Sequence, residues 1–111
     1  MVAVEPAESP VLSGGKTGAH HIDGIGAGFV VPLWRPDIAD DIERVSTAEA
    51  NAMARRLARE EGLFPGTSTG GNVVAAVRLA ERLGPNATVV TIMCDTGMKY
   101  LHTEGTFRQL G

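Results

Sequence analysis

Three consecutive residues with polar or reactive side chains, Cys94, Asp95 and Thr96, directly follow an apolar run and are followed by Gly97. The run, residues 87–93, is rich in β-branched side chains and carries no charge, which is typical of an interior strand of a parallel sheet covered on both faces. Ligands of open α/β sheets bind beyond the carboxyl ends of the strands. The pattern therefore predicts either a ligand site or an ordinary strand-to-helix turn with an Asp or Thr cap.

Two glycine-rich segments could also approach a ligand. Gly24, Gly26 and Gly28 occupy alternate positions, and glycine lets the backbone lie against a flat ligand or form a tightly packed bend. Residues 66–71 combine glycines with hydroxyls at the expected start of a helix. Free N–H groups there could bind an anion or a carboxylate, or the segment could simply cap the helix. Both interpretations stay open for each segment.

Several other motifs are rejected on their context. The stretch Gly14-Gly15-Lys16-Thr17 resembles the end of a phosphate-binding loop, but the position of the first glycine is Pro10. His20 and His21 are adjacent and have no second ligand cluster, so no metal site is expected. Cys94 ends an apolar run, which favours a packed, inert thiol over a nucleophile.

Composition limits the function classes. The chain has 111 residues, enough for one domain or part of one, and its net charge of -3 indicates no nucleic-acid surface. One cysteine excludes an intrachain disulfide and favours a reducing compartment. No segment approaches the ~20 apolar residues that span a bilayer, and the first ten residues do not resemble a signal peptide. We expect a cytoplasmic protein.

The elements that would position these groups alternate between helix and strand. A strand is expected at residues 2–4, a loop at 9–28, and a helix at 47–61 that begins with the capping box Ser46–Glu49 and ends at Gly62. Its apolar stripe comprises Ala50, Met53, Ala54 and Leu57.

The second half of the chain continues the alternation. A very short strand is expected at residues 63–64, followed by hydroxyl caps at 67–72 and a second helix that ends near residue 83. The apolar face expected for this helix comprises Val73, Ala76, Val77 and Ala80. Followed by the strand at 87–93, this order predicts an α/β fold, a partial parallel sheet with flanking helices.

Taken in order, the segments resemble the C-terminal part of a cysteine synthase, in the pyridoxal-phosphate family that includes cystathionine β-synthase and tryptophan synthase β. The resemblance covers nearly the whole chain from Val2 to Leu101. It rests on Val4-Glu5-Pro6, Ser13-Gly14-Gly15, the run from His21 to Val30, Pro32, Ala54-Arg55-Arg56-Leu57-Ala58, Glu60-Glu61-Gly62-Leu63, the turn at 66–71, Asp95-Thr96-Gly97 and Tyr100-Leu101.

The resemblance implies the type II fold of pyridoxal-phosphate enzymes, homodimers, pyridoxal 5′-phosphate as cofactor and β-replacement on O-acetylserine or a related amino acid. Thr96 stands where the family has a Ser or Thr bonded to the pyridine nitrogen, with Asp95 beside it in a structural role, and Gly24 lies in a loop close to the cofactor. Gly26, Ser68 and Thr69 would line the substrate cleft.

The resemblance also implies what this chain lacks. The family's Schiff-base lysine, its substrate-carboxylate loop and its phosphate cradle all belong to an upstream stretch, and Lys16 and Lys99 fall at non-catalytic positions. We therefore expect residues 1–111 to be the C-terminal portion of such an enzyme, with no catalytic residue of its own and no activity alone. The alternatives are a non-catalytic interaction or regulatory fragment, or a piece of a serine/threonine dehydratase or cystathionine β-synthase relative.

Overall fold

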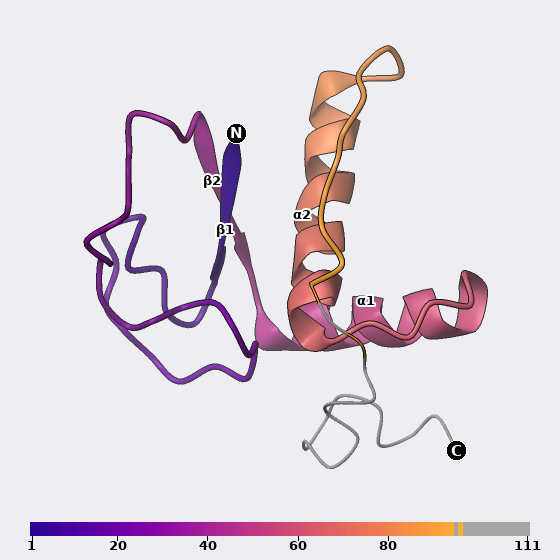
Figure 1. Ribbon diagram of the computed structural model, residues 1–111, viewed down its shortest axis with the longest axis horizontal. Helices are drawn as coiled ribbons and strands as arrows, with labels where there is room; N and C mark the ends of the chain where they lie inside the picture. The colour runs from indigo at the N-terminus through magenta and orange to yellow at the C-terminus, as the bar shows by residue number, and fades with distance from the viewer. Residues whose placement is uncertain (95, 97–111) are drawn as a thin grey trace.

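The computed structural model describes residues 1–94 and Thr96. In chain order it contains the strands β1 (Val2–Pro6) and β2 (Asp41–Val45), then the helices α1 (Thr47–Glu60) and α2 (Thr67–Leu83). The two strands pair in parallel, and α1 runs across the foot of α2 beside them (Figure 1). The expected strand at 2–4, the loop at 9–28 and the α/β class are confirmed.

β2 was not expected from the sequence, because three of its five residues are charged. The register pairs Val2 with Asp41 and Pro6 with Val45. Arg82 on α2 lies 2.5 Å from a carboxylate oxygen of Glu43 and 3.5 Å from one of Asp41. Because these ion pairs compensate two of its charges, a strand rich in charged residues can form here. Exposed ion pairs of this kind nevertheless add little to stability.

The first helix begins and ends nearly where the sequence indicates. The Ser46 hydroxyl accepts from the Glu49 backbone N–H, and the Glu49 carboxylate accepts from the Ser46 N–H, each at 3.1 Å. This is the expected capping box. Gly62, just beyond the helix, has φ +68°, the left-handed conformation that glycine adopts without strain.

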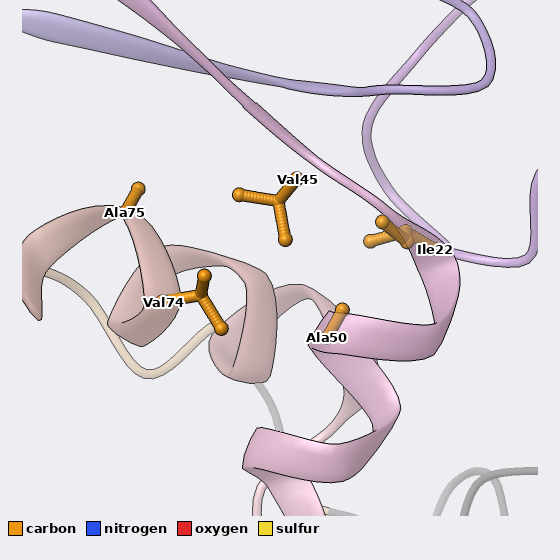
Figure 2. Packing of buried hydrophobic residues seen from close by; sticks show 5 residues of the cluster. All are labelled: Ile22, Val45, Ala50, Val74 and Ala75. Carbon is orange, nitrogen blue, oxygen red and sulfur yellow. The ribbon is translucent and has the colours of Figure 1, made fainter. Parts of the chain in front are cut away.

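A small apolar core joins the sheet, both helices and the long loop. Figure 2 shows its five buried residues, Ile22, Val45, Ala50, Val74 and Ala75. Val45 comes from the end of β2, and Ile22 comes from the loop at 9–28; both are fully buried. The loop is therefore anchored in the core rather than lying over the surface.

Two expectations for α2 were wrong, namely the residue at which the helix begins and the face that it buries. The helix begins at Thr67 after an N-cap glycine that offers no side-chain bond, so the hydroxyls and glycines at 67–71 form its first turns. The buried residues are Thr67, Ser68, Thr69, Gly70, Gly71, Val74 and Ala75. Val77, on the face expected to be buried, is 43% exposed. The helix turns its small residues inward because they allow α1 to come close.

Gly70 lies at the crossing of the two helices. A Cβ built on it would overlap the Ala50 carbonyl oxygen of α1 and lie 3.0 Å from the Ala54 nitrogen. Because both are backbone atoms, the clash cannot be relieved by a rotamer change. At Gly71 the same added atom would meet only the Ala50 Cβ, at 3.7 Å, an ordinary contact.

The expected buried strand at 87–93 is absent, and this expectation was wrong. No strand pairing is formed by these residues within the described part of the chain, and Val90 and Ile92 are 85% and 68% exposed. The segment instead runs along α2 (Figure 1), held where Asn72 Nδ2 donates to the Ile92 carbonyl oxygen at 3.1 Å. Its composition suits a covered strand, but no described strand lies beside it. The very short strand expected at 63–64 is also absent.

We predict that Gly70→Ala destabilises the fold by about 2–3 kcal/mol, because the new methyl group overlaps α1 backbone. Gly71→Ala is the matched control. It makes an ordinary contact and should be neutral or stabilising, because alanine is favoured over glycine within helices by about 1 kcal/mol. Thermal or urea unfolding followed by circular dichroism measures both. Equal effects of the two substitutions would contradict the account of the crossing.

We also predict that the chain associates with itself or is only marginally folded. The segment at 87–93 carries exposed apolar, β-branched residues that pair with no described strand, and such unpaired segments favour intermolecular pairing. Sedimentation velocity over a range of concentrations should show species larger than a monomer, or the melt should be broad. A sharp melt that is independent of concentration, with a monomeric sedimentation profile, would contradict this prediction.

Candidate functional site

The glycine segment of the loop forms an open hollow against β1. Gly24, Gly26 and Gly28 all have positive φ, +93°, +66° and +85°, which only glycine adopts readily. With Val4 and Phe29 they belong to the lining of a hollow of about 370 Å³. A Cβ built on Gly24 would meet no atom within 4 Å. The backbone at Gly24 is thus exposed to approach by a flat ligand.

A histidine closes the turn behind these glycines. The Nε2 atom of His20 lies 3.0 Å from the Gly26 carbonyl oxygen, and the Ile22 N–H donates to Nδ1 of the same ring at 3.1 Å. Gly26 itself is confined, since an added Cβ would lie 2.5 Å from His20 Nε2 and 2.6 Å from Pro6 Cγ. The sequence interpretation considered His20 only as a metal ligand and missed this contact with the backbone.

A buried carboxylate organises the start of the same loop. Glu5 on β1 is only 3% exposed, and its two oxygens accept from the N–H groups of Leu12 and Ser13 at 2.8 and 3.0 Å. The Ser13 hydroxyl donates to it as well. A buried charge needs such partners. Glu5 was missed as a positioning residue, although an acidic residue inside a strand is an available signal.

Thr96 lies beyond the carboxyl end of the segment at 87–93, as expected. It is exposed and forms an isolated antiparallel bridge with Pro65, just ahead of α2. Its neutral hydroxyl is a chemically suitable donor to a pyridine nitrogen. Asp95, expected beside Thr96 in a structural role at the cofactor, lies outside the described residues.

The two hydroxyls expected in the cleft are inside the helix packing. Ser68 and Thr69 are 6% and 3% exposed, and the Thr69 hydroxyl accepts from the Cys94 N–H at 3.1 Å. That bond ties the segment at 87–93 to the start of α2. Cys94 is exposed, so the expectation of a packed thiol was wrong.

The structure brings the three loop glycines together with β1, and it brings Thr69 next to Cys94. Among the described residues, Thr96 does not line the glycine hollow; it pairs with Pro65 instead. The chemistry of the glycine hollow and of Thr96 nevertheless fits pyridoxal phosphate, because an open glycine face suits a planar ring and a neutral hydroxyl suits its nitrogen.

The described part of the chain holds neither a metal-binding cluster nor a membrane-spanning helix. No group of three or more His, Cys, Asp and Glu side chains there could hold a metal ion. None of the helices described is long and apolar enough to cross a membrane.

Comparison with known proteins identifies the family. A family model described as "Pyridoxal-phosphate dependent enzyme" matches residues 1–95. A probable cysteine synthase of Bacillus subtilis is 48% identical over 101 residues, which are 91% of this chain and 32% of that protein. A cysteine synthase of Staphylococcus aureus is 45% identical over 103 residues, 93% of this chain and 33% of that protein.

Solved structures agree with the sequence comparisons. An O-acetylserine sulfhydrylase isoform of Entamoeba histolytica superimposes with a TM-score of 0.88 at 40% identity, covering 93% of this chain and 31% of that one. The architecture is thus part of the type II fold, and the chain spans about a third of the length of its curated relatives. The family model spans the strands, both helices and the glycine segment, so this chain belongs to the family of pyridoxal-phosphate-dependent enzymes.

Proposed function

We propose that this chain is the C-terminal portion of a cysteine synthase-like enzyme that replaces the β-substituent of O-acetylserine or a related amino acid. The observation that carries the proposal is the family match over residues 1–95, which includes the open glycine turn. The names of the relatives support the substrate class. The proposed setting is a cytoplasmic homodimer.

The chain's part in this reaction is to hold and orient the cofactor. Pyridoxal phosphate, when bound, supplies the electron sink for β-replacement. Thr96 donates a hydrogen bond to the pyridine nitrogen, and Gly24 presents open backbone to the ring. Because a hydroxyl is neutral, it does not hold that nitrogen protonated as a carboxylate would. Asp95 has a structural role beside Thr96.

Covalent attachment of the cofactor falls to a lysine in the portion of the family fold that this chain does not span. Lys16 is exposed in the loop, whereas a lysine that forms a Schiff base is usually activated by desolvation in a pocket. Lys99 lies outside the described residues. Gly26, Ser68 and Thr69 belong to the wall of the substrate cleft, Ser68 and Thr69 through the helix end that they build.

A second candidate function is a non-catalytic interaction fragment that acts by binding partner chains. The exposed apolar segment at 87–93 is the observation that favours it. A serine/threonine dehydratase or cystathionine β-synthase relative is the rival within the same family. Substrate specificity measured in a full-length enzyme separates these two from a cysteine synthase.

We predict that the chain alone does not form cysteine from O-acetylserine and sulfide above the rate of free pyridoxal phosphate, because it lacks the covalent and phosphate anchors. The assay adds the cofactor to purified chain and compares it with cofactor alone. Turnover that rises with protein concentration would contradict the prediction.

In the full-length enzyme, we predict that Thr96→Ala weakens cofactor binding by one hydrogen bond, about 0.5–1.5 kcal/mol. Thr96→Asp should do more harm, because it places a charge where the site holds a neutral partner. Thr96→Ser retains the hydroxyl and is the matched control, expected to be nearly silent. Cofactor affinity and the β-elimination rate measure all three.

One outcome would show that the roles of Asp95 and Thr96 are reversed. If Asp95→Ala abolishes cofactor binding while all three Thr96 variants match the wild type, then Asp95 is the contact and the assignment is wrong.

A further inference from the structure

Both ring nitrogens of His20 are bonded to the backbone of one turn. The Ile22 N–H points to Nδ1, and the Gly26 carbonyl oxygen lies against Nε2. A carbonyl oxygen only accepts, so Nε2 must carry a proton. A backbone N–H only donates, so Nδ1 must be bare. Of the three states of an imidazole, only the neutral ring protonated on Nε2 satisfies both contacts.

The turn between these contacts has little room to rearrange. Gly26 lies between the His20 ring and Pro6 of β1, at distances that would exclude even a methyl group. Ile22, at the other end of the turn, is fully buried in the core. The exposed face of Gly24 lies between these two fixed points. The shape of that face therefore depends on the ring.

One carboxylate, Glu8, interacts electrostatically with the histidine. The Glu8 carboxylate accepts from the Thr47 N–H at 2.8 Å at the start of α1, and the His21 N–H donates to the Thr47 hydroxyl at 3.1 Å. Burial acts to raise the pKa of Glu8, but the Thr47 bonds, its own backbone and the charge of His20 outweigh it and lower the pKa. Glu8 thus stays anionic and attracts a protonated His20.

The other titratable groups considered near His20 are Glu5, His21 and Asp23. The two oxygens of Glu5 are taken by Leu12 and Ser13. His21 directly precedes the turn and Asp23 lies within it, and both are exposed. Glu8 is the carboxylate whose charge interacts with that of a protonated His20. A protonated Nδ1 would lose the bond from the Ile22 N–H, because two donors would then face each other.

We propose that His20, as a neutral imidazole protonated on Nε2, is the positioning residue that locks the turn from Ile22 to Gly26, and that acid releases this lock. The sign follows from the contacts: the turn is fixed when the ring is neutral and is loosened when the ring takes up a second proton on Nδ1, so the loosening is expected on the acid side. The consequence for cofactor binding rests on the proposed function. The lock itself does not, because it is formed by the chain alone.

Nitrogen-15 NMR of the full-length protein that contains this chain, labelled selectively at histidine, isoleucine and alanine and prepared without cofactor, tests the lock. Long-range proton–nitrogen spectra at high pH should show His20 as the Nε2-protonated tautomer. On acidification, the Ile22 amide proton and the Ala27 nitrogen, which follows the Gly26 carbonyl, should shift with the midpoint of the His20 ring. The amide of Ala75 in α2 should stay in place and show that the fold persists.

Non-titrating variants complete the test. His20→Asn keeps an acceptor near the place of Nδ1, and His20→Gln keeps a donor near the place of Nε2, so both should abolish the pH-dependent shifts. In His20→Gln the Ile22 amide should exchange with solvent about two- to tenfold faster, as expected for one lost hydrogen bond. His21→Asn is the matched control and should leave the wild-type titration unchanged.

Three results would overturn the proposal. They are a ring protonated on Nδ1 at high pH, Ile22 and Ala27 signals that do not follow His20, and shifts that vanish in His21→Asn. Because no cofactor is present, none of these outcomes depends on whether pyridoxal phosphate binds at Gly24.

Discussion

The close crossing of α1 and α2 is the constraint on which the rest of the structure depends. At Gly70 the two backbones come so near that no side chain fits between them. This contact sets the direction of α2, and with it the positions of Val74 and Ala75 over Val45 of β2. It also fixes Thr69, whose hydroxyl holds Cys94 and so determines where the chain leaves toward Thr96. Gly70 is therefore needed at the start of α2 for the close packing of the two helices.

The loop between the strands is shaped by side chains that bond to backbone. Glu5 holds Leu12 and Ser13, His20 holds the glycine turn, and Glu8 holds the start of α1. Buried or partly buried backbone groups need such partners when no ladder or helix supplies them. The loop can therefore keep glycines at positive φ in an open face without losing its shape, and that combination is what a planar ligand requires.

Local signals in the sequence predicted the local structure, and signals that depend on distant neighbours did not. The capping box at Ser46 and the glycine after α1 act within one turn, and both are where the sequence places them. β2 was missed because its charges are compensated by Arg82, which is far away in the sequence. The run at 87–93 has the composition of a covered strand, but coverage requires neighbours that composition cannot supply. Among the site residues, the exposed Thr96 and the open Gly24 follow from motif positions, whereas the His20 and Glu5 contacts require the folded loop.

The parallel pairing of β1 with β2 has a kinetic consequence. Parallel strands are usually joined through a helix, but these two are joined by residues 7–40, which contain turns and no helix. Closing a long, flexible connection costs entropy before any ladder bond is formed. The α1–α2 crossing joins residues much nearer in sequence and rests on a well-capped helix, so it can form first. We therefore expect the helix pair to provide the surface on which the sheet assembles late, with the docking of Ile22 from the loop against Val45 as the slow step.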